Sequence, residues 1–375
     1  MRLNGDVDKE LELGQTLAGV ISGGSFAGYC IAILASAALT ERYGPRRVVV
    51  AAALVAAIGM TGIALASDAI WLAGAVLLGG CSTGLASPPL AAAIAMSVQE
   101  DRRDAANTIV NAGTSIGVGL SGAIAVWIAQ EWRLAFGGFA AVAFVLAVAA
   151  PLAVPGGQSP EDRKVGLPSI SGALIRLIAA AFMMGAASTS LWSFGGQLAA
   201  LNLGWQDRQI GILWTVIGVS SIAGAWAGLL VTRYGISRVH WTFLSLMAAG
   251  MVTVGTSFLS SIGVLFGGAL FGASYVLLSG VYLVWGLRIL PDSPAIGLMV
   301  GFLMMAVGQT VGAPVFGILL ERFDVDTAVF AFALLGMVSG LCSQGDRFSP
   351  DCCGLERKVK SADQVTDSTL TSSSP

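Results

Sequence analysis

The feature that most constrains this chain is a succession of long apolar stretches separated by short hydrophilic breaks. A helix of about 20 apolar residues crosses the roughly 30 Å hydrocarbon core of a bilayer. The unbroken apolarity favours helices over β-barrel strands, because barrel strands are about ten residues long and alternate in polarity. We therefore predict an all-α fold, a polytopic membrane helix bundle of about 11 transmembrane helices at residues 13–39, 47–66, 70–97, 105–129, 134–153, 171–199, 210–232, 239–258, 260–287, 295–320 and 327–343.

Composition excludes several classes of protein. Hydrophobic residues make up 55% of the chain and charged residues only 11%, against about 25% charged in soluble domains. A water-soluble globular enzyme is therefore excluded. The net charge of −2 offers no basic surface for nucleic acid. The partners that we expect are the lipid bilayer and a small-molecule solute, with the chain acting as a monomer.

Basic residues in the short loops predict the orientation, because Lys and Arg are retained on the cytoplasmic side. One set of alternate loops carries Arg42, Arg46, Arg47, Arg102, Arg103, Arg163, Lys164, Arg176, Arg233, Arg238 and Arg288. The other set carries only Arg133, Arg208 and Arg322. We expect a multi-pass protein of the cell (inner or plasma) membrane, with the 40–47 loop and the C-terminus cytoplasmic and the N-terminus outside.

The hydrophilic segments also suggest how the chain is divided. The Pro/Gly-rich, charged segment at 154–170 is typical of a linker. We predict a polar N-terminus at 1–12, an N-terminal bundle of five spans at 13–153 and a C-terminal bundle of six spans at 171–343. The polar, Ser/Thr-rich tail at 344–375 is expected to be a disordered cytoplasmic segment.

The two predicted halves resemble each other in sequence. Glu41-Arg42-Tyr43-Gly44 in the first half is matched by Thr232-Arg233-Tyr234-Gly235 in the second. Two glycine patterns recur in the same order: Gly79-Gly80 and Gly84 as Gly267-Gly268 and Gly272, and Gly113, Gly117 and Gly122 as Gly308, Gly312 and Gly317. The offsets of 191, 188 and 195 residues are nearly equal. A duplicated bundle is typical of transporters that bind their substrate at the midplane, where the halves meet.

At these residues the chain resembles the major facilitator superfamily. The hallmark of that family is Gly-x-Leu-Ala-Asp-Arg-x-Gly-Arg-Lys in the loop after the second helix. The first copy here has Ala37, Glu41, Arg42, Gly44 and Arg46, and the second keeps Gly228, Leu230, Arg233 and Gly235. Trp132-Arg133 with Phe136 is also similar to the start of the family's sixth helix. Only one span precedes the first motif, so the resemblance implies that the family's first helix is missing, through truncation or in a divergent, inactive copy.

The predicted spans lack the charged residues that usually form proton or ion sites within a membrane. Apart from Arg176 near a helix end, their interiors contain no charged residue, and such residues usually mark proton or ion sites. Where proton-coupled antiporters of the family carry an arginine and a proline, the matching positions are Gly80 and Val118. The pattern Gly113-x-Ser115-x-Gly117 lacks the strand–turn–helix context of a hydrolase. We expect no enzyme activity, no catalytic residue, no cofactor and no metal.

Polar and aromatic residues within the spans are the candidates for binding substrate. They are Asn107, Asn111, Ser115, Trp192, Gln197, Tyr275, Ser279, Tyr282, Gln309 and Thr310. By the resemblance, their spans line the family's central cavity, which suggests a weakly polar site for a neutral or amphipathic solute. The alternative for each is helix–helix hydrogen bonding or, for the tryptophan, interfacial anchoring.

The loop motifs suggest a second, conformational role. Glu41, Arg42 and Arg46, with Arg102 and Arg103, could form a cytoplasmic latch that favours one access state. The complete set is Glu41, Arg42, Gly44, Arg46, Arg102, Arg103, Arg233, Gly235 and Arg238. The alternative is that these arginines only set topology.

The function predicted from the sequence is therefore secondary active or facilitative transport of a small solute by alternating access. The alternative is a truncated or non-transporting membrane protein, a receptor-like relic. The sequence alone leaves the solute, the direction of transport and any coupling ion open.

Overall fold

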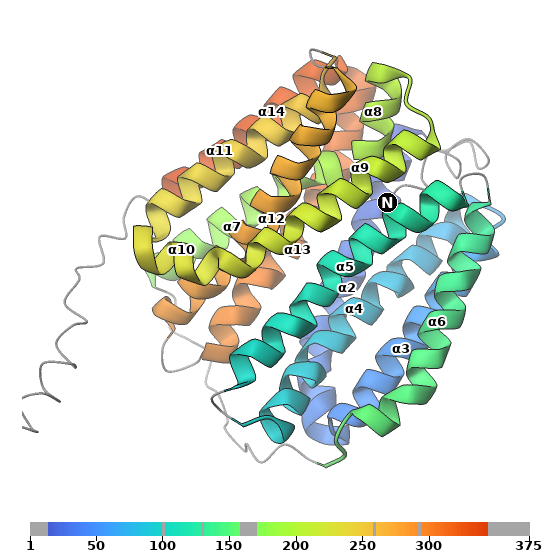
Figure 1. The fold of residues 1–375 in the computed structure, drawn as a ribbon, viewed down its shortest axis with the longest axis vertical. Helices are drawn as coiled ribbons and strands as arrows, with labels where there is room; N and C mark the ends of the chain where they lie inside the picture. Colours follow the sequence, from blue (N-terminus) through green and yellow to red (C-terminus); the bar gives the residue numbers. More distant parts are fainter. Residues whose placement is uncertain are drawn as a thin grey trace, which may run out of the picture. The chain divides into compact units, whose positions relative to one another are not determined.

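The regular structure of the chain is helical throughout the described residues (Figure 1). The computed structural model describes residues 14–99, 102–128, 131–157, 171–257, 260–290 and 294–343. In the first half these form α2 (Gln15–Tyr43), α3 (Pro45–Ala64), α4 (Ala69–Ser97), α5 (Arg103–Trp127) and α6 (Trp132–Ala153). In the second half they form α7 (Gly172–Trp192), α8 (Gly195–Leu203), α9 (Asp207–Ser220), η2 (Ser221–Trp226), α10 (Ala227–Tyr234), α11 (Ile236–Gly255), α12 (Ser261–Ile289), α13 (Pro294–Arg322), α14 (Val325–Val338) and η3 (Ser339–Ser343).

The prediction of an all-α membrane bundle is confirmed, and each predicted span overlaps a helix. Within the described residues, nine helical segments are long and apolar enough to cross a membrane. Two predicted spans are not among the nine. The corresponding helices, α5 and α11, are 25 and 20 residues long, and in α5 only the shorter stretch Gly113–Ile124 is strongly apolar.

Two spans expected to be continuous are interrupted. The span at 171–199 is divided by Ser193 and Phe194 into α7 and α8. The span at 210–232 is divided by the 3₁₀ segment η2. Ser220 and Ser221 both donate hydrogen bonds to the Ile217 carbonyl, at 2.9 and 2.7 Å. Hydroxyls bonded back to the preceding turn bend helices, which accounts for the change of helix type at this point.

The repeated loop motif has the same backbone conformation in both halves. Gly44 has φ 80° and ψ 157°, and Gly235 has φ 82° and ψ 157°. Residues other than glycine are strained at such positive φ angles, because their Cβ atom clashes with the backbone. The glycine of the motif is therefore required by the sharp turn that joins α2 to α3 and α10 to α11.

Two of the repeated glycines in α4, Gly80 and Gly84, and their counterparts in α12, Gly268 and Gly272, pack against equivalent helices. A Cβ at Gly80 or Gly84 would collide with the backbone of α2, at Ser25 and Tyr29. A Cβ at Gly272 in α12 would collide with the Ile217 backbone of α9. Because α2 and the α9–α10 segment each precede a copy of the loop motif, the repeat in the sequence is also a repeat in packing.

The third glycine pattern shows where the halves differ. Gly308 and Gly312 of α13 approach the backbone of α7 at Phe182 and Ala186. A Cβ at their counterparts in α5, Gly113 and Gly117, would have no heavy atom of the described residues within 4 Å. Of the most apolar 18 residues of α7, 67% are buried, against 22% in α3, α4 and α6. The described part of the first half therefore has no helix in the place that α7 takes in the second.

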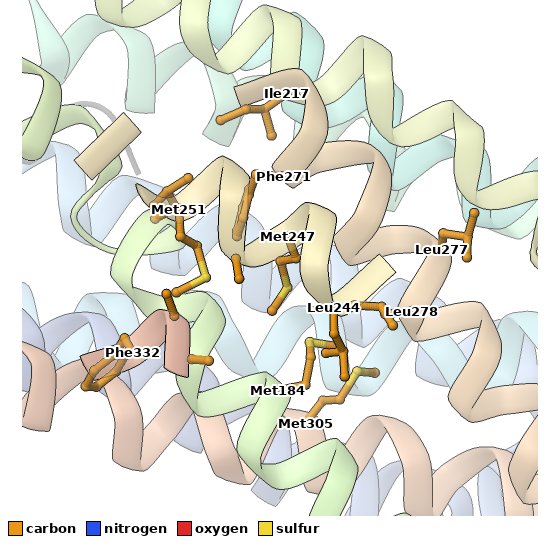
Figure 2. Close-up of a cluster of buried hydrophobic side chains, with 14 of the residues drawn as sticks. Met184, Ile217, Leu244, Met247, Met251, Phe271, Leu277, Leu278, Met305 and Phe332 are labelled. Atoms are coloured by element: carbon orange, nitrogen blue, oxygen red, sulfur yellow. The ribbon is translucent and has the colours of Figure 1, made fainter. Parts of the chain in front are cut away.

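The same difference appears in the hydrophobic cores. The second half has an extensive core in which Met184, Leu244, Met247, Met305 and Phe332 pack together (Figure 2). The first-half cluster is small and centres on Ile63, Leu72, Trp132 and Phe136. Because lipid chains are as apolar as these side chains, such a core stabilises a membrane bundle through close van der Waals packing between helices.

The described helices belong to one compact unit, which extends to Ser343. Contacts of α2 with α13 and of α5 with α9 join the predicted halves within it. The division at 154–170 into two bundles stays a prediction. The predicted N-terminus at 1–12, most of the linker and the tail at 344–375 lie outside the described residues.

Candidate functional site

Three polar side chains lie at the midpoints of three long helices. Tyr29 is the central residue of α2, Tyr275 is the central residue of α12, and Gln309 is next to the central residue of α13. Each helix has 29 residues. At 1.5 Å per residue these side chains are about 20 Å along the axis from either helix end. They therefore lie at the depth expected for the middle of a bilayer.

Hydrogen bonds and close contacts connect these residues across helices. The Gln309 Nε2 group donates to the Tyr275 hydroxyl at 3.1 Å and lies 3.5 Å from Ser188 Oγ of α7. Tyr29 is close enough to Tyr275 for the two hydroxyls to interact electrostatically. Side chains from α7, α12 and α13 thus meet at one point, and Tyr29 of α2 lies near it.

Aromatic rings cover one side of this point. Trp192 stacks on Trp214 of α9 with ring centroids 5.7 Å apart. Its ring also meets the edges of Tyr275 at 5.1 Å and Phe271 at 5.7 Å. Tyr29, Ser188, Trp192, Tyr275 and Gln309 are called the central cluster below. It combines amide and hydroxyl groups with flat apolar surface and contains no charged side chain.

The charged residues of the same helices lie at their ends. Arg42 is in the last turn of α2, Arg288 in the last turn of α12 and Arg322 in the last turn of α13. Among the described residues, no group of three or more His, Cys, Asp or Glu side chains could hold a metal ion. The chemistry available at the central cluster is therefore neutral hydrogen bonding and aromatic contact.

Other residues predicted for the site lie elsewhere or are engaged. Ser279 and Thr310 donate to the carbonyls of Tyr275 and Ala306 in their own helices, each at 2.9 Å, although Thr310 also contacts Cys30 of α2. Ser115 is buried in α5, and Gln197 lies in the short helix α8. The side chains of Asn107 and Asn111 lie outside the described residues.

Tyr282 belongs to a separate structural cluster, although it shares a helix face with Tyr275. It has no exposed surface; its hydroxyl lies 3.2 Å from the Ala180 carbonyl and 2.9 Å from His240 Nε2. The tyrosine proton goes to the Ala180 carbonyl, so the His240 ring donates to the tyrosine oxygen through Nε2–H. Its Nδ1 atom has no hydrogen-bond partner among the described residues. Tyr282 thus ties α7, α11 and α12 together.

We expect Tyr282→Phe to destabilise the protein without changing solute affinity. The substitution leaves the buried His240 Nε2–H group without its acceptor, which costs about 1–3 kcal/mol. Thermal unfolding of the purified protein in detergent measures the loss, and solute binding provides the control. If the variant bound the solute more weakly but unfolded at the same temperature, this assignment would be wrong and Tyr282 would be a binding residue.

The two halves approach each other most closely through glycines. Gly19 and Gly23 of α2 face the backbone of α13 at Ala313 and Thr310, and Gly317 of α13 faces Gln15. Gly122 and Gly119 of α5 pack against α9 at Thr215 and Gly218. We call these positions the glycine seam: Gly19, Gly23, Gly119, Gly122, Gly218 and Gly317. Along the chain, Gly19 and Gly23 lie in the first half of α2, Gly119 and Gly122 in the second half of α5, and Gly317 in the second half of α13.

The residues of the predicted latch are distributed over three connections: between α2 and α3, before α5, and between α10 and α11. Arg46 donates to the carbonyl of Val154 at 2.7 Å, and Arg42 lies 5.3 Å from the Tyr43 ring centroid. Arg233 has the same arrangement over Tyr234 at 5.3 Å, and Arg238 is exposed in the first turn of α11. Arg102 is exposed before α5, and the Arg103 side chain lies outside the described residues. No ion pair of Glu41 with a described residue supports a latch.

Sequence reasoning found Trp192, Tyr275 and Gln309 but missed Tyr29, Ser188 and Trp214. One signal pointed to Tyr29. Of the five tyrosines, two lie in the loop motifs and two in the second half, so Tyr29 is the only one within a first-half span. Ser188 and Trp214 gave no such signal, because serine and tryptophan recur throughout the spans.

Comparisons with known proteins agree with this architecture. The sequence profile of the Major Facilitator Superfamily matches residues 4–294, whereas no curated protein sequence matches significantly. The fold is similar to the crystal structure of a mutant form of the nucleoside transporter NupG, with a TM-score of 0.72, 13% identity and coverage of 91% of this chain and 93% of that chain.

It is also similar to a bacterial homologue of the human lysosomal transporter Spinster. The inward-facing, occupied form matches with a TM-score of 0.71 and 16% identity, and the unoccupied form with 0.71 and 15%; both comparisons cover 93% of this chain and 94% of that chain. Because the family profile extends over more than half of the chain, this membrane protein belongs to the major facilitator superfamily.

Proposed function

We propose that this protein is a secondary transporter that moves a small, neutral, partly aromatic solute by alternating access. The observation that carries the proposal is the central cluster, an uncharged group of hydrogen-bonding and aromatic side chains contributed by both halves at mid-depth. Transporters built from two related halves bind substrate at this place.

The chemistry of the cluster defines the class of solute. The Gln309 amide and the hydroxyls of Tyr29 and Tyr275 can exchange hydrogen bonds with hydroxyl or amide groups of a ligand. The Trp192 and Tyr275 rings offer apolar faces for an aromatic ring. A net charge on the solute would enter a low-dielectric region without a counter-ion, at a cost of several kcal/mol. Nucleosides satisfy these requirements, and a structural neighbour is a nucleoside transporter.

The glycine seam supports the alternating-access part of the proposal. Positions where backbones touch without intervening side chains allow helices to move over one another. The seam closes the bundle on the side predicted to be outside. Transport then consists of separating the halves at the seam while the opposite ends come together, with the central cluster exposed to one side at a time.

Uptake into proteoliposomes tests the proposed function. The protein is reconstituted and offered radiolabelled uridine or adenosine, with a nucleoside monophosphate as the charged analogue and protein-free liposomes as the control. We expect saturable uptake of the nucleoside and none of the monophosphate. Equal uptake of the charged analogue would exclude the neutral site proposed here.

The second candidate is a non-transporting membrane protein that binds a solute without moving it. The observation in its favour is the open face of α5 at Gly113 and Gly117, where the second half packs α7. The same preparation distinguishes the two functions. Equilibrium binding without uptake in proteoliposomes would support the second candidate, whereas counterflow of labelled solute would exclude it.

A further inference from the structure

A pocket lined by arginines lies where α2 ends and α3 begins, remote from the central cluster. Arg42, Arg46 and Arg47 line it together with Gly156 and Gly157 from the segment after α6. Its volume is about 360 Å³, within the range of small-molecule sites. These residues are called the arginine pocket below.

The walls of the arginine pocket are held by close backbone packing. Gly44 faces the Gly157 carbonyl so closely that a Cβ on Gly44 would lie 2.5 Å from its oxygen. A Cβ on Gly156 would lie 3.1 Å from the Arg46 guanidinium carbon. The hydrogen bond from Arg46 Nε to the Val154 carbonyl, at 2.7 Å, fixes that side chain across the pocket. The site is therefore built from two chain segments, residues 42–47 and 154–157.

The positive charge of the arginine pocket is not neutralised by the described residues. Arg42 contacts the Tyr43 ring and Arg46 a carbonyl. No carboxylate of the described chain pairs with either of them or with Arg47, and all three side chains are exposed. Apart from the Arg46 Nε–H group, which is bonded to Val154, the three guanidinium groups present their N–H donors in planar forks suited to phosphate oxygens.

The start of α3 adds to this preference for anions. The pocket lies at the N-terminus of a 20-residue helix that begins at Pro45. Backbone N–H groups in the first turn of a helix have no partner within it, and the helix dipole favours negative charge there. The N-terminus of α3 and the three arginines therefore both favour binding of an anion.

The repeat-related loop in the second half lacks this arrangement. Gly235 has the same backbone conformation as Gly44, but a Cβ there would meet no heavy atom within 4 Å in the part of the chain that the structure describes. Arg233 and Arg238 thus occupy a similar loop without the wall that Gly156 and Gly157 provide. The pocket is a property of the first half and does not follow from the loop motif alone.

We propose that the arginine pocket binds the phosphate oxyanion of an anionic phospholipid headgroup from the adjacent leaflet. The pocket lies at the end of membrane-spanning helices, on the side with the excess of arginine. Basic pockets between transmembrane helices on this side bind acidic headgroups. A bound headgroup bridges α2, α3 and the segment after α6 and holds them in their present arrangement.

Native mass spectrometry of the full chain in neutral detergent tests the proposal. The protein is titrated with phosphatidylglycerol, with zwitterionic phosphatidylcholine for comparison. We expect one tightly bound phosphatidylglycerol, with an affinity that falls about fivefold for Arg47→Gln and about one hundredfold for the triple variant R42Q/R46Q/R47Q. Arg47 is exposed and makes no hydrogen bond, ion pair or ring contact with a described residue, so its single substitution is expected to preserve the fold.

The matched control removes three arginines from the same side of the second half, as R233Q/R238Q/R288Q. It changes the net charge equally and is expected to retain the bound lipid. Equal loss in both triple variants, or in neither, would overturn the site. Inorganic phosphate is expected to compete only at millimolar concentration. If it binds more tightly than phosphatidylglycerol, the lipid as the source of the oxyanion is excluded.

Discussion

Replacing Gln309 by alanine is expected to lower kcat/KM for the transported solute by about 10- to 100-fold. The amide donates to Tyr275 and is 6% exposed, so its loss removes a ligand contact and leaves the Tyr275 hydroxyl without its donor. An uncompensated polar group of this kind costs about 1–3 kcal/mol. Initial rates of uptake over a range of solute concentrations, in proteoliposomes of equal protein content, measure the effect.

The control for this prediction is Gln197→Ala. It makes the same chemical change in α8, outside the central cluster, and is expected to leave uptake within twofold of the unsubstituted protein. Tyr275→Phe, which keeps the ring and removes only the hydroxyl, should fall between the two. Uptake by Gln309→Ala equal to that by Gln197→Ala would show that the central cluster does not contact the solute.

Replacing Gly218 by valine is expected to shift the protein away from the conformation described here. A side chain at Gly218 would collide with the Gly119 backbone, and overpacking of this kind costs about 1–3 kcal/mol. That energy shifts a two-state equilibrium by about 5- to 150-fold. The separated halves would expose Cys30, at mid-depth in α2 and in contact with Thr310. Labelling of Cys30 by an impermeant maleimide from the side where α2 begins should therefore accelerate.

Gly117→Val is the control for the seam, measured in the same background with the other cysteines replaced. It adds the same side chain to a helix glycine, but at a position with no neighbour within 4 Å. Labelling should then stay at the rate of the parent. If both variants accelerate labelling equally, loss of helix stability rather than separation at the seam is the cause.

The fold was largely predictable, because the bilayer restricts the choice of structure so strongly. Every predicted span overlaps a helix, and the repeat offsets identified equivalent positions such as Gly44 and Gly235 that share a backbone conformation. The interruptions at Ser193 and Ser221 were not predicted. At these points the Ser193 hydroxyl bonds to Ser22 of α2 and the Ser221 hydroxyl to the Ile217 carbonyl, each at 2.7 Å, and the apolarity of a span does not reveal such bonds.

The site was predictable only in part, because a helix face is a local property and a meeting of helices is not. Trp192, Tyr275 and Gln309 were chosen as polar or aromatic residues within spans, and they do meet. Tyr282 satisfies the same rule, but its side chain lies between α7 and α11. There its hydroxyl is hydrogen-bonded to His240 and to the Ala180 carbonyl. A spacing of seven residues predicts that two side chains share a helix face. It does not predict which other helices pack against that face at each of the two positions.

The stacked indoles of Trp192 and Trp214 have an optical consequence. Two chromophores with centroids 5.7 Å apart and planes inclined by 30° couple their electronic transitions. They belong to different helices, so their coupling changes when those helices change spacing. The near-ultraviolet circular dichroism of the unlabelled protein is therefore expected to report changes in the distance between α7 and α9.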